Sequence, residues 1–158
     1  MGDSNRFLVF AKFIARNYKP CKVADVAGGI GLVSHYLNEI GFHSTVIDPR
    51  KIKPSNQYPL SHYQFSQIPR IRSLFSENME EDYDLIVGLH PDEATEVIIQ
   101  SAIHKHIAVV PCCHFWNGIE SHGSPDMKTT ICRFLQRHNL HYSITTLPMS
   151  GKNIVIWT

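Results

Sequence analysis

The chain has 158 residues, 43% of them hydrophobic and 18% charged, with a formal net charge of +1. This composition predicts a globular domain rather than a disordered chain, since a chain of this length buries roughly two-thirds of its unfolded surface on folding. The near-neutral charge carries no global signature of nucleic-acid binding. No apolar run reaches the ~20 residues that span a bilayer, and the opening MGDSNRFLVF lacks the pattern of a signal peptide, so we expect no membrane contact.

The cysteine count is low, and two of the four cysteines are adjacent. Such a set does not predict a disulfide framework. We therefore expect a reducing, cytoplasmic setting for the residues Cys21, Cys112, Cys113 and Cys132.

The first part of the chain alternates helix and strand patterns. Apolar residues recur at helical spacing over 4–18, with Ser4 as a candidate N-cap. The β-branched run at 22–26 predicts a strand, and STVIDP at 44–49 predicts a second one. Between them lies GLVSHYLNEIG, which predicts a helix with a buried face of Leu32, Val33, Tyr36, Leu37 and Ile40.

The middle of the chain begins with a Pro-rich, polar segment at 50–69, in which YPLSHYQF predicts a short irregular helix. A weak third strand is predicted at 70–75 and a strong fourth strand at 83–91. DEATEVIIQSAIHK follows the fourth strand, and it predicts a helix with Asp92 as its N-cap and acidic residues in its first turn.

The last part of the chain predicts a fifth strand at 106–115, a loop at 116–125 and an amphipathic helix at 126–138. The tail segments LHYSITTLP and KNIVIWT alternate in polarity around MSG, which predicts a hairpin. Together these elements predict an α/β fold that is Rossmann-like and doubly wound. We expect one domain over 1–158, with a mostly parallel seven-stranded sheet that ends in a C-terminal antiparallel hairpin.

Open parallel sheets bind ligands at the carboxyl ends of their strands. In the predicted sheet, the glycine-rich turn ADVAGGIG follows the first strand and Asp48 ends the second. A glycine turn lets a ligand lie against bare backbone, and an acidic side chain in the position of Asp48 suits the hydroxyls of a ribose. These features predict a site for a nucleoside cofactor.

The turn does not match the two common phosphate-binding patterns. A dinucleotide fingerprint needs a third glycine, where this chain has Ser34, and a P-loop needs Gly-Lys-Ser/Thr, which is absent. The spacing Asp-x-x-Gly-Gly-x-Gly instead resembles motif I of the class I S-adenosylmethionine-dependent methyltransferases, and the resemblance covers most of the chain. Ala27 stands where that family most often has a glycine.

The resemblance implies that S-adenosylmethionine is the cofactor. It also implies that the glycine turn passes under the methionine and ribose portion, and that Asp48 holds the ribose hydroxyls. Including the other strand ends, the expected cofactor-binding residues are Asp25, Ala27, Gly28, Gly29, Gly31, Asp48, Pro49, Phe75 and His90.

A narrower resemblance lies in VGLHPDEATE and VVPCCHF. These segments are similar to a methyltransferase subgroup that includes a tRNA ribose 2′-O-methyltransferase, which implies RNA as a candidate substrate. A small-molecule acceptor is the alternative. For recognition of RNA, we expect a protein partner or a further domain to contribute.

His90 and Asp92 flank the position where substrate meets the methyl donor in this family, so they are the candidate catalytic residues. Either side chain could take a proton from the acceptor, although methyl transfer needs mainly in-line positioning. Structural roles are the alternative, with His90 capping a turn and Asp92 capping the next helix.

Cys112 and Cys113 are compatible with two roles, as buried small hydrophobes or as a nucleophile. We expect no metal site with His114, because adjacent residues on a strand point to opposite faces. Phe115 and Trp116 either stack on a base or close an edge of the core. The basic residues of 50–72 form either a solvated loop or a footprint for a polyanion.

Two other functions compete with the methyltransferase. One is a binding module that keeps the cofactor fold without catalysis. The other is a nicotinamide-dependent oxidoreductase, which the missing third glycine and the terminal hairpin disfavour.

Overall fold

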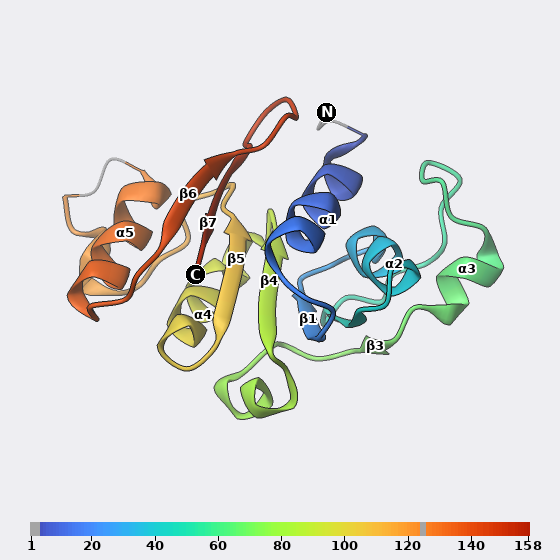
Figure 1. The fold of residues 1–158 in the computed structure, drawn as a ribbon, viewed down its shortest axis with the longest axis horizontal. Helices are drawn as coiled ribbons and strands as arrows, with labels where there is room; N and C mark the ends of the chain where they lie inside the picture. Colours follow the sequence, from blue (N-terminus) through green and yellow to red (C-terminus); the bar gives the residue numbers. More distant parts are fainter. Residues whose placement is uncertain (1–3, 124–125) are drawn as a thin grey trace.

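A twisted sheet with the strand order β3-β2-β1-β4-β5-β7-β6 forms the centre of the computed structural model, which describes residues 4–123 and 126–158 (Figure 1). Its strands are β1 (Lys22–Val26), β2 (His43–Ile47), β3 (Arg70–Ile71), β4 (Leu85–Leu89), β5 (His106–Val110), β6 (Ser143–Thr146) and β7 (Ile154–Trp157). Strands β1 to β5 pair in parallel, whereas β7 pairs antiparallel with both β5 and β6. The predicted fold class and terminal hairpin are therefore confirmed.

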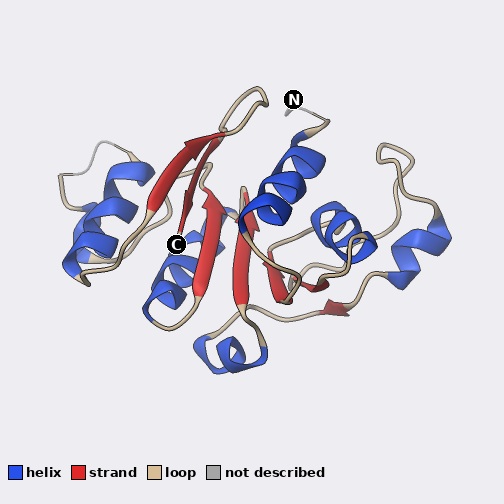
Figure 2. Ribbon diagram, in the orientation of Figure 1, coloured by secondary structure: helices blue, strands red, loops and turns tan. Residues whose placement is uncertain are grey.

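The described residues form five α-helices, of which four cover the two faces of the sheet and one, over 62–67, lies beside its edge without a buried residue (Figure 2). They are α1 (Arg6–Asn17), α2 (Leu32–Glu39), α3 (His62–Gln67), α4 (Thr95–Gln100) and α5 (Met127–Arg137). Short 3-10 helices follow the strands or interrupt the loops at Glu77–Asp82, Asp92–Ala94, Ser101–Ile103 and Ile119–Ser121. No helix of the described residues is both long enough and apolar enough to cross a membrane.

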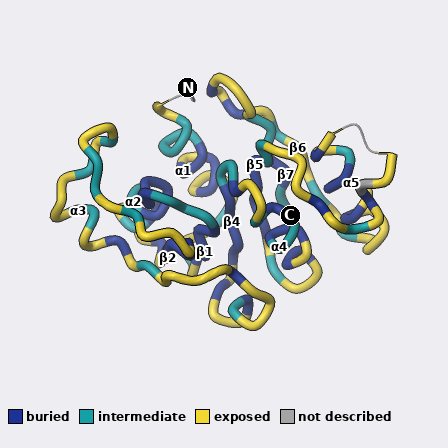
Figure 3. The backbone as a smooth tube through the Cα atoms, turned by 180° about the vertical axis from the view of Figure 1, so that it is seen from behind, coloured by how far each residue is buried: buried dark blue, intermediate teal, exposed yellow. Residues whose placement is uncertain are grey.

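Alternation along the strands divides the core into two layers, because successive side chains point to opposite faces. Val23 packs with α1 and α2, and its neighbour Ala24 packs with α4 and α5. The same division separates Leu85 from Ile86 in β4. Figure 3 shows that the central strands are buried, whereas the segment from residue 50 to α3 is mostly exposed.

Several predicted boundaries are wrong at the ends of elements. Helix α1 begins at Arg6 after Asn5, so Ser4 is not its N-cap. Helix α2 ends at Glu39, which leaves Ile40 53% exposed instead of on the buried face. Gly41 follows with a φ of 98°, the left-handed backbone that ends many helices.

The predicted third, fourth and fifth strands are longer than the observed ones. β3 has only two residues, because it pairs with β2 at Arg70 and Ile71 alone. β5 ends at Val110, before the cysteines, where its pairing with β4 stops. Pairing with a neighbour sets the length of a strand, and a local pattern does not contain that information.

The segment after β4 also differs from the prediction. Pro91 precedes a 3-10 turn over Asp92–Ala94, and no side chain caps the start of that turn or of α4. Asp92 is therefore not the helix cap, although the acidic first turn is present. By contrast, Ser61 forms a capping box with Gln64 at the predicted short helix.

The loop and the helix before the hairpin largely follow the predicted boundaries. A 3-10 turn lies inside the predicted loop 116–125, of which residues 124–125 are outside the described part of the chain. The side chain of Asp126 accepts a hydrogen bond from the Thr129 amide, so the predicted helix at 126–138 begins with a side-chain cap. The expectation that the opening segment is not a signal peptide rests in part on residues 1–3. These residues also lie outside the described part of the chain.

Candidate functional site

The glycine-rich turn lies between the carboxyl end of β1 and the start of α2. Ala27, Gly29 and Gly31 adopt left-handed backbone with φ values of 55°, 54° and 85°. The Ala27 amide donates to the Ile47 carbonyl of β2 at 2.8 Å, and the Gly31 amide donates to the Gly28 carbonyl at 2.9 Å. Glycine adopts such backbone without strain, whereas Ala27 does so at a cost of about 1 kcal/mol.

Asp25 lies beneath the turn and is buried. Its carboxylate accepts a hydrogen bond of 2.9 Å from the Ser34 hydroxyl of α2. Burial raises the pKa of Asp25 to about 6, although the bond from Ser34 works against that shift. A Cβ on Gly28 would lie 2.6 Å from this carboxylate, so only glycine fits above it.

Arg70 of β3 donates two hydrogen bonds to backbone carbonyls of the turn. Its Nη1 donates to the Gly29 carbonyl at 2.7 Å, and its Nη2 donates to the Ile30 carbonyl. The guanidinium also stacks 4.2 Å from the ring centre of Phe65 in α3. These contacts fix the carbonyls of Gly29 and Ile30, and the amides of Ala27, Gly29 and Gly31 are likewise bonded within the protein.

Asp48, directly after β2, is 4% exposed and accepts several hydrogen bonds. The Gly29 amide donates to its Oδ2 at 3.0 Å. Arg50 donates from Nε to Oδ1 at 2.9 Å and from Nη2 to Oδ2 at 2.7 Å. Burial opposes ionisation, but the hydrogen bonds from Arg50 and Gly29 outweigh it and hold the pKa of Asp48 below its ordinary value.

A cleft of about 580 Å³ opens beside the turn at the carboxyl ends of the strands. Among the residues that sequence reasoning selected, it is lined by Asp25, Ala27, Gly28, Gly29, His90, Asp92, Cys112 and Cys113. The remaining selected residues lie elsewhere. Gly31 is buried behind the turn, Asp48 lies under Arg50, Pro49 is exposed, and Phe75 is part of the core.

His90 follows β4 with a φ of 54°, a left-handed conformation that is rare for residues other than glycine. Its Nε2 lies 2.8 Å from the Lys152 carbonyl in the β6–β7 hairpin. A carbonyl oxygen only accepts, so Nε2 carries the proton and a neutral ring keeps its lone pair on Nδ1.

Asp92 has a φ of 48° and is exposed. Its Oδ1 accepts a hydrogen bond of 2.9 Å from the Cys112 thiol. Burial and this contact with Asp92 raise the pKa of the Cys112 thiol to about 12, which does not favour a nucleophilic thiolate. Cys112 is half-buried and Cys113 exposed, so the prediction of two buried hydrophobes is wrong.

The aromatic and basic candidates divide into residues that are buried or bonded within the protein and residues that are exposed. Trp116 is buried against Phe134 with ring centres 5.6 Å apart, which makes it a core residue, whereas Phe115 is exposed. Arg50 and Arg70 are engaged within the protein, whereas Lys51 and Lys53 are exposed and free to face solvent or a ligand.

Sequence reasoning missed several residues that line the cleft. Arg6 and Phe7 come from α1, and Ile52 and Tyr58 come from the loop before α3. Phe7 and Tyr58 meet edge to face, with ring centres 5.9 Å apart. No local pattern indicates this meeting, because the two residues are brought together only when α1 and the loop pack over the same edge of the sheet.

No family model matches the chain. The chain is 32% identical over 102 residues to a Caenorhabditis briggsae protein named probable tRNA (uracil-O(2)-)-methyltransferase. That match covers 61% of this chain and 18% of the relative, so the chain spans less than a fifth of the relative's length.

Two solved structures share the fold. One is the Burkholderia thailandensis 1,6-didemethyltoxoflavin-N1-methyltransferase, solved with bound 1,6-didemethyltoxoflavin and S-adenosylhomocysteine. Its TM-score is 0.58 at 14% identity, and the match covers 98% of this chain and 77% of that one. The other is the Geobacter metallireducens precorrin-6y C5,15-methyltransferase, with a TM-score of 0.56 at 14% identity and coverage of 96% and 83%. At this identity the likeness establishes the Rossmann-like fold that these two methyltransferases share with the chain, and nothing finer.

Proposed function

We propose that the chain is an S-adenosylmethionine-dependent methyltransferase domain, formed by residues 1–158, that methylates an oxygen or nitrogen atom of RNA. The observation that carries the proposal is the junction of two strand ends. The glycine turn after β1 and Asp48 after β2 are joined by the hydrogen bond from the Gly29 amide, at the edge of the sheet where such folds bind ligands.

The cleft suits a nucleoside cofactor. Its volume of about 580 Å³ lies within the range of small-molecule sites. Because Gly28 has no Cβ above Asp25, no side chain projects from this part of the turn into the cleft. A Cβ on Gly29 would meet only the Arg50 side chain, at 3.7 Å, so there is space beside the turn. Backbone and carboxylate oxygens supply the polar groups that a ribose and an amino acid require. When bound, S-adenosylmethionine supplies an electrophilic methyl group on a sulfonium.

Within this proposal, the side chains of the chain have distinct roles. Asp48 accepts the ribose hydroxyls once Arg50 moves away from its carboxylate. The glycine turn supports the cofactor through bare backbone, as the resemblance to motif I implies. Because Asp48 is buried and Arg50 bonds both of its oxygens, displacing Arg50 costs about 1–3 kcal/mol, which the bonds from the ribose hydroxyls must offset.

His90 is the proposed proton acceptor. Nε2 is held by the Lys152 carbonyl, so Nδ1 is the nitrogen that can take a proton from the acceptor atom. Asp92 is the second proposed catalytic group, with one oxygen bonded to Cys112. In both cases the side chain orients the acceptor, and in-line positioning contributes more to methyl transfer than proton removal does.

RNA is the proposed acceptor class for two reasons. The relative from Caenorhabditis briggsae carries a tRNA methyltransferase name, and the segments around His90 and Cys112 resemble a subgroup with a tRNA ribose 2′-O-methyltransferase. Because the chain spans only 18% of that relative, we propose that a partner protein or a further domain supplies part of the RNA recognition.

A cofactor-binding module without catalysis is the second candidate. One observation favours it. Arg50 donates to both oxygens of Asp48, so in this structure the carboxylate forms an ion pair within the protein and does not face a ligand. The two candidates share the cofactor and differ only in methyl transfer.

Calorimetry tests the cofactor. We expect S-adenosylmethionine and S-adenosylhomocysteine to bind with one site per chain, and NAD not to bind. Tighter binding of NAD than of S-adenosylhomocysteine would overturn the proposal in favour of an oxidoreductase.

A radiolabelled methyl donor tests the reaction. The protein is incubated with total tRNA, with total RNA and, separately, with a small-metabolite extract. Transfer to RNA that is lost in His90→Ala supports the proposal, whereas transfer to the metabolite extract alone identifies a small-molecule methyltransferase. Tight cofactor binding with no transfer to any of the three favours the silent module.

A further inference from the structure

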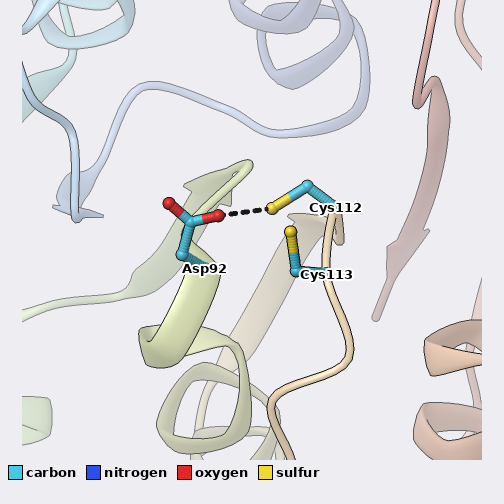
Figure 4. A group of neighbouring side chains, drawn as sticks. All are labelled: Asp92, Cys112 and Cys113. Carbon is cyan, nitrogen blue, oxygen red and sulfur yellow. Dashed lines mark hydrogen bonds between the residues drawn. The ribbon is translucent and has the colours of Figure 1, made fainter.

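Three metal-ligating side chains converge between the ends of β4 and β5. Asp92, Cys112 and Cys113 each direct one ligand atom to the same point, and these three atoms lie within 4.8 Å of one another (Figure 4). Asp92 comes from the turn before α4, and the two cysteines come from the loop after β5. The Cys112 thiol already lies 2.9 Å from the Asp92 carboxylate.

The sequence excludes a metal site here because adjacent strand residues point to opposite faces. That premise is wrong for Cys112 and Cys113, since β5 ends at Val110 and both cysteines lie in the loop that follows. In Figure 4 the Cys112 sulfur faces the Asp92 carboxylate, and the Cys113 sulfur lies beside that of Cys112. His114 does not join them, because its Nε2 lies 3.1 Å from the Thr130 hydroxyl.

The backbone that presents Asp92 is strained. His90 and Asp92 flank Pro91, and both have positive φ, at 54° and 48°. Non-glycine residues in this conformation cost about 1 kcal/mol each and concentrate at functional sites. This strained turn sets the Asp92 carboxylate opposite the cysteine pair.

We propose that Asp92, Cys112 and Cys113 bind a zinc-class divalent cation, with a fourth coordination position left open toward the cleft. Two cysteines, which lose their thiol protons to solvent when the metal binds, and a carboxylate match the ligand preference of zinc, which takes sulfur at about 2.3 Å and oxygen at about 2.1 Å. Tetrahedral geometry then requires ligand atoms about 3.6–3.8 Å apart. The ligand atoms now lie within 4.8 Å of one another, so they must close up slightly, and Asp92 and Cys113 are exposed side chains that can rotate toward the half-buried Cys112.

The position of the cluster gives the open coordination site a use. Cys112 and Cys113 line the cleft beside the glycine turn and also a neighbouring cavity of about 420 Å³. The second cavity is lined by Lys128, Lys152 and the acidic Asp126, and its net positive charge suits a phosphate-bearing ligand. A metal with three protein ligands keeps a position for an oxygen of such a ligand, as open zinc sites do. The proposal concerns metal binding and does not depend on methyl transfer.

Metal titration of the full chain tests the proposal. The protein is kept reduced with a phosphine, stripped with a chelator and titrated with Zn²⁺ alone in competition with a chromophoric chelator. Co²⁺ is titrated in parallel, because thiolate ligands give it an intense charge-transfer absorption. We expect one ion per chain and a thiolate-to-cobalt band.

Variants assign the ligands. Cys112→Ser and Cys113→Ser should each weaken Zn²⁺ binding at least about 100-fold and reduce the cobalt band, and Asp92→Asn should weaken binding by about 10-fold. The matched control is Cys21→Ser. Cys21 directly precedes β1 and so lies at the amino ends of the strands, away from the carboxyl ends where Cys112 and Cys113 lie. Circular dichroism of each variant confirms that it folds.

Two outcomes would overturn the proposal. One is a folded, reduced wild-type protein that takes up no Zn²⁺ at micromolar concentration. The other is binding that Cys112→Ser and Cys113→Ser leave unchanged. Calorimetry with S-adenosylhomocysteine on the same samples keeps this test separate from that of the proposed function, since either ligand can bind without the other.

Discussion

The guanidinium of Arg50 lies against the carboxylate of Asp48, with its Nε 2.9 Å from Oδ1 and its Nη2 2.7 Å from Oδ2. Both oxygens of the carboxylate are therefore in use, and the Gly29 amide shares Oδ2. A ligand that needs Asp48 competes with this ion pair. Because Arg50 is exposed and Asp48 is buried, the arginine is the partner that moves.

Substitution of these two residues should have opposite effects on S-adenosylhomocysteine affinity. Asp48→Asn should weaken binding by about 1–3 kcal/mol, because it removes the acceptor for two hydroxyl groups. Arg50→Gln should strengthen binding by up to about 3 kcal/mol, because it removes the charged internal competitor for the buried Asp48 carboxylate. Calorimetry measures both, and unchanged affinity in Asp48→Asn would show that this strand end is not the ribose site.

Arg70→Lys should destabilise the protein by about 2–3 kcal/mol. A lysine ammonium does not replace the planar fork that bonds the carbonyls of Gly29 and Ile30 together. Urea unfolding monitored by circular dichroism measures the change. The matched control is Arg72→Lys, since Arg72 is exposed and should shift the free energy of unfolding by less than about 0.5 kcal/mol.

Gly28→Ala should destabilise the fold by about 1–3 kcal/mol, because its Cβ would lie 2.6 Å from the buried Asp25 carboxylate. The carboxylate cannot move aside without breaking its bond to Ser34. Urea unfolding gives the free energy, and a variant as stable as the wild type would mean that the turn yields more easily than its packing implies.

Ala27→Gly should instead stabilise the protein by up to about 1 kcal/mol. The φ of Ala27 is 55°, and glycine removes the strain of that conformation while adding some entropy to the unfolded chain. The same unfolding assay applies. A loss of more than about 1 kcal/mol would show that the Ala27 methyl group makes contacts whose loss outweighs the relief of strain.

Asp25 should make the protein less stable as the pH rises. Its pKa is raised from 3.8 to about 6, so the folded protein binds the proton more tightly than the unfolded chain does. The resulting stabilisation is fully present below pH 3.8 and is lost as the pH rises through about 6. Two pKa units correspond to about 3 kcal/mol.

Asp25→Asn isolates this effect, because it removes the titrating group and keeps an oxygen that accepts from Ser34. Relative to the wild type, the variant should gain about 2 kcal/mol in free energy of unfolding between pH 4 and pH 7, because part of the effect is already lost at pH 4. Urea titrations at several pH values give the difference. A constant difference across that range would mean that Asp25 keeps its ordinary pKa in the folded state.

Much of the fold could be predicted because its signals are local. Alternation of helix and strand patterns predicted the doubly wound sheet, and the tail around MSG predicted the hairpin that β6 and β7 form. The glycine turn and Asp48 were located because each directly follows a strand. Strand ends were predicted less well, as β3 and β5 show, because they depend on where a neighbouring strand stops pairing.

The amino-acid sequence by itself determined the turn, the acid at the end of β2 and the order of elements that brings them to one edge. Only the tertiary structure decided which groups meet there. Arg70 reaches the Gly29 carbonyl across 41 positions of sequence, and Cys112 reaches Asp92 across 20. Such contacts form when distant strands pair side by side, and a local pattern records the geometry of one element but not the identity of its neighbours.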